Sequence, residues 1–97
     1  MIDNTNEILS ILQEECAEVI QAVSKVNRFG MTGMNPKDNK NNQYHLEEEI
    51  GDLTCMIELL IENGIVNKDN IDSAAINKRV KLRKWSTIFL NNNIPNQ

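Results

Sequence analysis

The apolar residues of this chain recur at helical spacing in three separate stretches. The first extends from Asp3 to about Asn27, and either Asp3 or Asn4 can accept a hydrogen bond from the free amides of a first helical turn. Residues three and four apart share one face of a helix, so we expect a helix here. Its apolar stripe consists of Ile8, Leu12, Cys16, Val19, Val23 and Val26.

The second stretch runs from about Tyr44 to Asn63, and Gly64 is placed to take the left-handed conformation that ends a helix. Its apolar positions are Leu46, Ile50, Leu53, Ile57 and Leu60. Their alternating steps of four and three are typical of a helix that packs along its length against another helix.

The rest of the chain predicts a third helix and a long loop. Asn67 or Asp69 can cap a helix that we expect to reach about Leu90, with an apolar line of Ile71, Ala75, Leu82 and Phe89. Between Phe29 and Gln43 the chain is rich in turn-forming residues and has no apolar periodicity, which predicts a loop. No stretch shows the alternation of a strand.

These elements predict an all-α fold with three main helices. We expect a single domain over residues 1–90 and a frayed tail over residues 91–97, which is rich in Asn and broken by Pro95. Each helix would leave part of its apolar stripe uncovered. We therefore expect a homodimer or a dimer of dimers, in which helices from several copies complete a four-helix-bundle core.

Two carboxylates of the second helix lie inside its apolar stripe. At about 100° per residue, with Leu46 as zero, Glu49 falls at about 300° and Asp52 at about 240°, both between apolar neighbours. Glu47 and Glu58 fall on the outward side, where we expect solvated charges.

The first helix has carboxylates in the same placement. With Ile8 as zero, Glu15 falls at about 340°, Glu18 at about 280° and Glu14 further out at about 240°. All three lie on the same flank of the apolar stripe.

The third helix carries cations in the corresponding places. With Ile71 as zero, Lys78 falls at about 340° and Lys81 at about 280°. Acids and lysines in these positions can also form buried ion pairs or a polar layer that fixes the helix register, and this structural alternative stays open. The acids outnumber the two lysines, however, and a hard divalent cation with oxygen ligands would remove the surplus of negative charge. The set as a whole therefore favours a metal site.

Net charge, cysteine spacing and hydropathy argue against nucleic-acid polymers, zinc and membranes as partners. The net charge of −4 argues against a binder of nucleic-acid polymers, which needs a surplus of Lys and Arg on its contact face. Cys16 and Cys55 lack the spacing of a zinc site, so we expect two small core residues. No stretch approaches membrane-spanning length and no basic segment leads into an apolar run, so we expect a cytoplasmic protein without membrane contact.

The acidic motifs resemble those of a known family. Glu-Glu-x-x-Glu at Glu14, Glu15 and Glu18, followed by Glu-x-x-Asp at Glu49 and Asp52, is similar to the signature of MazG-like nucleoside triphosphate pyrophosphohydrolases. These belong to an all-α NTP pyrophosphatase superfamily. The segments 24–30 and 78–85 also resemble that family, the latter through its Lys-x-x-Lys stretch before Trp85. The likeness spans about residues 12–85.

The resemblance implies Mg²⁺-dependent cleavage between the α- and β-phosphates of a nucleoside triphosphate, which releases a nucleoside monophosphate and pyrophosphate. Mn²⁺ is a possible substitute for Mg²⁺. The implied metal ligands are Glu15, Glu18, Glu49 and Asp52, and Glu14 would complete the catalytic acids by coordinating at the edge or positioning water. The implied substrate-binding residues are Lys25, Arg28, Lys78, Lys81 and Trp85. Trp85 would stack on a base, although its place near 320° favours core packing.

Two alternatives accompany this reading. The same acids would serve an enzyme that hydrolyses an alarmone or a modified nucleotide, and only substrate profiling separates that activity from hydrolysis of canonical or aberrant (deoxy)nucleoside triphosphates. A non-catalytic helical oligomerisation module with the same fold is the alternative from a different functional class.

Overall fold

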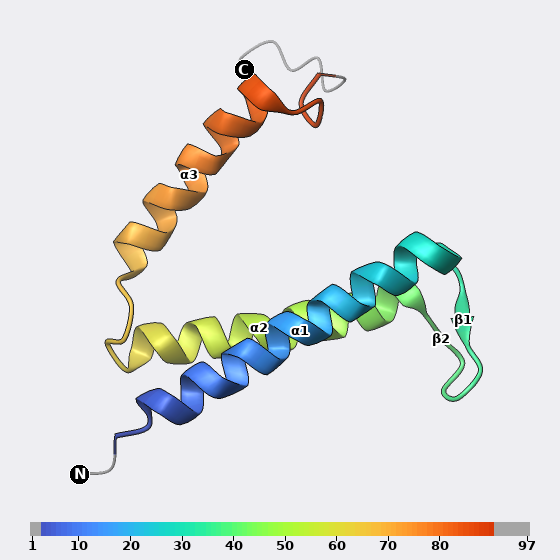
Figure 1. Ribbon diagram of the computed structural model, residues 1–97, viewed down its shortest axis with the longest axis horizontal. Coiled ribbons are helices and arrows are strands. Elements are labelled where there is room, and N and C mark those ends of the chain that lie inside the picture. Colours follow the sequence, from blue (N-terminus) through green and yellow to red (C-terminus); the bar gives the residue numbers. More distant parts are fainter. Residues whose placement is uncertain (1–2, 91–97) are drawn as a thin grey trace. The chain divides into compact units, whose positions relative to one another are not determined.

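The computed structural model describes residues 3–90 and has an all-α architecture, as predicted (Figure 1). Its elements in chain order are α1 (Thr5–Phe29), β1 (Met34–Asn35), β2 (Lys40–Asn41), α2 (Asn42–Glu62) and α3 (Lys68–Trp85). The three helices confirm the predicted fold class. The tail over residues 91–97, expected to fray, lies outside the described residues.

Short polar side chains bond to free backbone amides where each helix begins. The Asp3 carboxylate accepts a hydrogen bond from the Thr5 amide at 2.9 Å. Asn41 accepts one from the Tyr44 amide at 2.8 Å before α2, and Asn67 accepts one from the amide of residue 70 at 3.1 Å before α3. These bonds satisfy donors that a helix leaves without intrahelical partners. They explain why the sequence located the starts of α1 and α3 closely and placed that of α2 only two residues late.

The helix ends agree less well with the prediction. Gly64 has a φ of 69° after the end of α2, which confirms its predicted left-handed conformation. The end of α3 at Leu90 was wrong, because the helix stops at Trp85. Ser86 takes an extended conformation with φ −127° and ψ 161°, and its hydroxyl oxygen accepts a hydrogen bond from the Ile88 amide at 3.1 Å. The chain therefore turns away from helical geometry there.

The predicted loop contains a small β-hairpin. β1 and β2 pair antiparallel, with Met34 opposite Asn41. Strands of two residues are too short to show a sequence alternation, so the pattern gave no sign of them. The buried side chain of Asn42 donates a hydrogen bond to the Gly30 carbonyl at 2.9 Å, and its backbone amide donates to the Gly33 carbonyl at 2.9 Å. Asn42 thereby fixes the hairpin against the end of α1.

α1 and α2 lie side by side in opposite directions, joined by the hairpin (Figure 1). The apolar core lies toward the start of α1 and the end of α2, where Ile8 packs with Met56 and Leu60. The partly buried residues around it are Ile11, Leu12, Leu59, Ile65 and Val66. Burial of this cluster supplies the hydrophobic contribution that holds the helix pair together.

One line of buried and half-buried side chains on each of the two helices recurs every seven residues, which is two helical turns. On α1 and α2 these positions are Ile8, Glu15, Ala22, Asn42, Glu49 and Met56. The outer four are buried, whereas the two glutamates are half-buried. The seam between the helices therefore carries charge in its middle and uncharged side chains at both ends.

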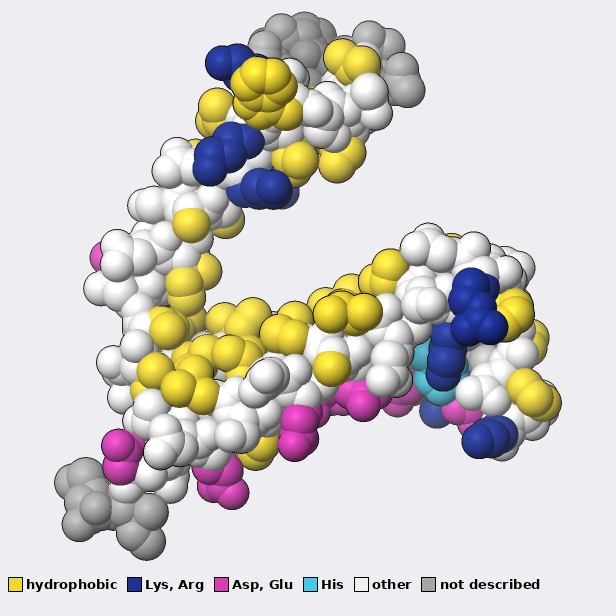
Figure 2. Space-filling view, in the orientation of Figure 1, with side chains coloured by type: hydrophobic (Ala, Val, Ile, Leu, Met, Phe, Trp, Pro, Cys, Tyr) yellow, Lys and Arg dark blue, Asp and Glu magenta, His cyan; other side chains and the backbone are white. Residues whose placement is uncertain are grey.

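The seam uses only one side of each predicted apolar stripe. Ile50 remains 46% exposed and Val23 41% exposed, although both were placed in the packed stripes. Cys16 and Cys55 are also exposed, so their prediction as core residues was wrong for the single chain. The reason is that the seam passes through Glu15 and Glu49 instead of the stripe centres. Figure 2 shows apolar side chains along one edge of the α1/α2 pair and acidic side chains along the opposite edge.

The chain divides after Val66 into two compact units, the α1/α2 pair with its hairpin and the segment containing α3. Within its own unit α3 has no buried residue and Trp85 is 78% exposed, so that unit by itself does not provide the core packing expected for this indole. The single domain over residues 1–90 stays a prediction. Among the described helices, none is sufficiently long and apolar to cross a membrane.

Close packing at Gly33 generates a test of the hairpin. A Cβ atom there would lie 2.8 Å from both the Asn42 side-chain nitrogen and the Phe29 carbonyl oxygen, whereas a Cβ at Gly51 in α2 would meet nothing within 4 Å. We expect Gly33→Ala to lower the free energy of unfolding by about 1–3 kcal/mol through overpacking. Gly51→Ala should leave it unchanged or raise it by roughly 0.5–1 kcal/mol through helix propensity. Urea unfolding measures both, and equal stability of the two variants would contradict the hairpin packing.

Candidate metal centre

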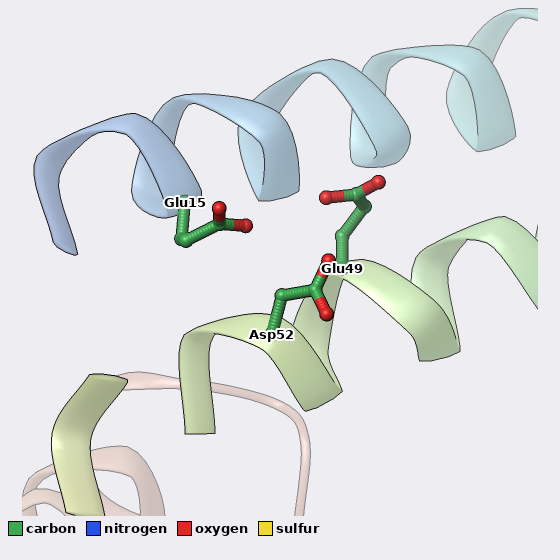
Figure 3. Close-up of side chains that lie close together, drawn as sticks. All are labelled: Glu15, Glu49 and Asp52. Carbon is green, nitrogen blue, oxygen red and sulfur yellow. The ribbon is translucent and has the colours of Figure 1, made fainter. Parts of the chain in front are cut away.

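Three carboxylates meet between α1 and α2. Glu15 comes from α1, and Glu49 and Asp52 come from α2. One oxygen of each lies within 4.8 Å of the others, and Figure 3 shows the three side chains directed toward the same space between the helices. Glu49 and Asp52 share a helix face because they are three residues apart, and the antiparallel packing brings Glu15 opposite them. The structure thus brings together three of the four predicted metal ligands.

The other two predicted acids lie at the border of this cluster. Glu18 is exposed and lines a small cavity of about 60 Å³ together with Glu49. Glu14 is also exposed and belongs to neither the cluster nor the cavity. Glu18 is thus placed to act beside the three-carboxylate cluster, and Glu14 is further out, as the helical angles indicated.

Loss of solvent and mutual repulsion raise the pKa values of two of these groups. Partial loss of solvent raises the pKa of Glu15, and the charges of Asp52, Glu18 and Glu14 raise it further. The pKa of Glu49 is raised by the same loss of solvent and then by the charges of Glu18, Asp52 and Glu15. Both carboxyl groups therefore hold their protons more tightly than an isolated glutamate does.

No basic side chain compensates the three carboxylates within their own unit. Across residues 3–66, no lysine or arginine forms an ion pair with Glu15, Glu49 or Asp52. A cluster of carboxylate oxygens is the donor set of hard divalent cations, and Mg²⁺ in particular is held by a few carboxylates while it keeps several waters. The residues present therefore fit a divalent cation, and such an ion would relieve the repulsion that raises the two pKa values.

The predicted substrate-binding residues fall into two groups. Lys25 lines the small cavity with Glu18 and Glu49, so it belongs to the surroundings of the carboxylates. The Arg28 guanidinium lies 4.8 Å from the ring centroid of Phe29, at the end of α1. The remaining three, Lys78, Lys81 and Trp85, are exposed on α3 in the other unit, and their roles toward a substrate stay predictions.

His45 lies between two carboxylates and beside the small cavity. Its Nε2 lies 3.0 Å from the Asp38 carboxylate and its Nδ1 lies 3.4 Å from that of Glu48, while the ring lines the small cavity with Glu49. The Asp38 pKa is lowered, first by a hydrogen bond from the Lys40 amide and then by His45. The contact with Glu48 has helical spacing and was visible in the sequence. The contact with Asp38 depends on how the hairpin folds back.

The raised pKa values predict how stability depends on pH and metal. In the folded protein the pKa values of Glu15 and Glu49 are raised above their ordinary value of 4.5. These groups therefore favour the folded state at acidic pH, and they oppose it at a pH where they are ionised in both the folded and the unfolded protein. Mg²⁺ should therefore raise the Tm more at about pH 8 than at about pH 5, where more of these carboxyl groups hold a proton.

Thermal unfolding of the wild type and of the Glu15→Gln/Glu49→Gln double variant, at both pH values with and without Mg²⁺, measures this effect. Without metal at about pH 8 the double variant should have the higher Tm, because it lacks the repulsion, and it should not respond to Mg²⁺. An equal rise of Tm with Mg²⁺ in both proteins would mean that the ion binds elsewhere.

Comparison with known proteins agrees with this geometry. Residues 4–80 match the model of the MazG nucleotide pyrophosphohydrolase domain, a segment that contains α1, the hairpin, α2 and most of α3. The search of curated proteins found no match, and neither did that of solved structures. The matched segment covers more than half of the chain and includes all three clustered carboxylates, so the chain belongs to the MazG nucleotide pyrophosphohydrolase family.

Proposed function

We propose that this protein is a Mg²⁺-dependent nucleoside triphosphate pyrophosphohydrolase. It cleaves the anhydride between the α- and β-phosphates, and water supplies the oxygen that completes the nucleoside monophosphate and pyrophosphate. The observation that carries the proposal is the cluster of Glu15, Glu49 and Asp52 without a basic partner in its own unit, in a member of a nucleotide pyrophosphohydrolase family. Such a cluster suits a metal-bound polyphosphate better than it suits a structural layer.

The acids have distinct roles in this proposal. The metal ligands are Glu15, Glu18, Glu49 and Asp52, and Mn²⁺ can substitute for Mg²⁺ at such oxygen donors. The bound ion would neutralise phosphate charge and lower the pKa of a coordinated water. Glu14 lies at the border, where its carboxylate is free to orient the attacking water and accept its proton. Its exposed position on α1 supports this peripheral role.

Basic side chains complete the proposed site by binding phosphate oxygens. Lys25 is the best supported, because it lines the same cavity as Glu18 and Glu49. Arg28, Lys78 and Lys81 are further candidates, and each is exposed and available for charge-assisted hydrogen bonds. Trp85, with most of its indole exposed, is available to stack on a base.

Exposed apolar side chains support a homodimer or a dimer of dimers. On the α1/α2 pair, Leu9 is 41% exposed, Ile20 is 69% exposed, and both Val23 and Ile50 also lie outside the seam. Figure 2 shows that apolar side chains gather on the edge of the pair opposite the acids. Helices of a second copy that cover this edge would complete a four-helix core and leave the carboxylates accessible. We place the activity in the cytoplasm, where nucleotide pools are available.

Turnover of a substrate panel tests the proposed function. The purified chain should release pyrophosphate from one or more members of a panel of ribo-, deoxyribo- and modified nucleoside triphosphates and guanosine alarmones when Mg²⁺ is present. Glu49→Gln should lower kcat/KM at least about 100-fold, because a lost metal ligand removes a few kcal/mol of transition-state stabilisation. It should also weaken Mg²⁺ binding measured by calorimetry.

Glu47→Gln is the matched control, since Glu47 lies two residues away on the same helix and points outward, outside the cluster. This variant should keep the activity and the Mg²⁺ affinity of the wild type, with unchanged helical circular dichroism in both. Retention of Mg²⁺ affinity and turnover in Glu49→Gln would refute the assignment. Absence of turnover on the whole panel would favour the non-catalytic helical module.

A further inference from the structure

The β-hairpin is held to the start of α2 at two neighbouring residues. The Asp38 carboxylate lies 3.0 Å from Nε2 of His45. The Lys40 ammonium lies 4.5 Å from the ring centroid of Tyr44 and 3.5 Å from its hydroxyl oxygen. The two contacts are linked, because the Lys40 amide donates a hydrogen bond to the Asp38 carboxylate at 3.0 Å. The roles proposed above for the metal ligands do not account for either contact.

His45 connects the hairpin with the carboxylates of the site. Glu49 follows it by four residues, so the two side chains are neighbours on one face of α2. His45 also lines the small cavity together with Glu49, Glu18 and Lys25, whereas Tyr44 does not line it. The two hairpin contacts are therefore adjacent in the chain, but only one of them borders the site.

The imidazole of His45 lies between two carboxylates. Its Nδ1 lies 3.4 Å from Glu48, so each ring nitrogen faces an acid, and a ring that offers an N–H to both sides carries a positive charge. Nε2 is buried and has no well-aligned hydrogen bond among the described residues, so the charge of Asp38 compensates it as an ion pair. Without the imidazole, both acids would add unpaired negative charge beside a cavity that already contains Glu18 and Glu49.

The position of the hairpin also bears on Lys25. The hairpin forms a wall of a second cavity, of about 470 Å³, whose lining includes Met34, Pro36 and Lys25. Lys25 thus lines both this cavity and the small one. A displaced hairpin would change the surroundings of the cation that is best supported as a phosphate ligand.

We propose that His45 is a positioning residue for the phosphates of the substrate. Its imidazole holds the hairpin on α2 through Asp38, fixes the wall of the small cavity, and offsets the charges of Asp38 and Glu48, which would otherwise repel a polyphosphate. In this role it contacts neither substrate nor metal, since both ring nitrogens face carboxylates. The inference rests on the proposed function, because it requires phosphates to reach the metal ligands.

Calorimetric binding of inorganic tripolyphosphate in the presence of Mg²⁺ tests this role without turnover. His45→Ala should weaken tripolyphosphate binding about 3-fold or more, as expected for coupled neighbouring residues, and should leave the affinity for Mg²⁺ alone unchanged. His45→Gln should retain part of the lost affinity, because its amide can still donate to one carboxylate. Tyr44→Ala is the matched control, which removes the hairpin contact outside the cavity and should bind as the wild type does. Equal losses in His45→Ala and Tyr44→Ala would overturn the inference.

Hydrogen exchange followed by NMR tests the contact itself. The amides of Asn39 and Asn42 each donate a backbone hydrogen bond of 2.9 Å at the hairpin and report on its opening. His45→Ala and Asp38→Asn should each speed their exchange roughly 2- to 5-fold, the range for a partly exposed ion pair. The Asn side chain retains an oxygen for the Lys40 amide, so only the charge is lost. The double variant should exchange no faster than either single variant, and additive effects would contradict the pairing.

The two measurements separate this inference from the proposed function. Non-additive exchange in a protein that binds no tripolyphosphate would refute the proposed function and the role of His45 toward phosphates. Additive exchange in a protein that releases pyrophosphate would overturn only the role of His45. With any triphosphate that is hydrolysed, His45→Ala should raise KM and leave kcat within about 2-fold, whereas loss of folded protein would lower the apparent kcat at unchanged KM.

Discussion

Repulsion among Glu15, Glu49 and Asp52 is the constraint on which the arrangement of the α1/α2 pair depends. These carboxylates are held within 4.8 Å of one another in the middle of a helix seam, with Ile8 and Met56 packed at one end of it. Apolar side chains of similar volume would pack there at no electrostatic cost. Because no ion pair with lysine or arginine offsets the charge within residues 3–66, the ionised cluster opposes folding unless a proton or a cation binds. This repulsion is the basis of the proposed metal site.

The small core follows from this placement. The apolar side chains buried within the described residues are Ile8, Ala22, Met56 and Leu60. Half-buried glutamates occupy seam positions that would otherwise extend this core, and several apolar side chains of both helices, among them Ile20, Val23 and Ile50, stay exposed. A second copy packed on these side chains would add hydrophobic burial without covering the acids. In the proposed oligomer this burial would compensate for stability that the carboxylates remove.

Much of the site was predictable from the sequence, because charge inside an apolar stripe is a local pattern. The wheel angles placed Glu15 and Glu49 on the flank that packs, and the structure brings both into the cluster with Asp52. Asp3, one residue before the N-cap of α1, and Asn67, the N-cap of α3, similarly marked two helix starts, because each side chain accepts a hydrogen bond from an amide two or three residues further on.

Features that depend on distant parts of the chain were not predictable. An apolar stripe is wider than one helix contact, so its spacing did not indicate that Ile50 and Cys16 stay outside the seam. The hairpin strands have two residues each, too few to show an alternation of apolar and polar residues. The pairing of His45 with Asp38, and the position of Lys25 in both cavities, exist only because the hairpin folds back onto α1 and α2.

The position of a bound ion is the most direct test of the proposal that Glu15, Glu49 and Asp52 bind a divalent cation. Crystals of the wild-type protein grown with millimolar Mn²⁺, measured at a wavelength where Mn²⁺ scatters anomalously, locate the ion without reference to turnover. We expect an anomalous peak between α1 and α2, coordinated by oxygens of Glu15, Glu49 and Asp52. Mn²⁺ bound only at other acidic residues, or a lysine or arginine side chain in place of the ion, would contradict the metal centre.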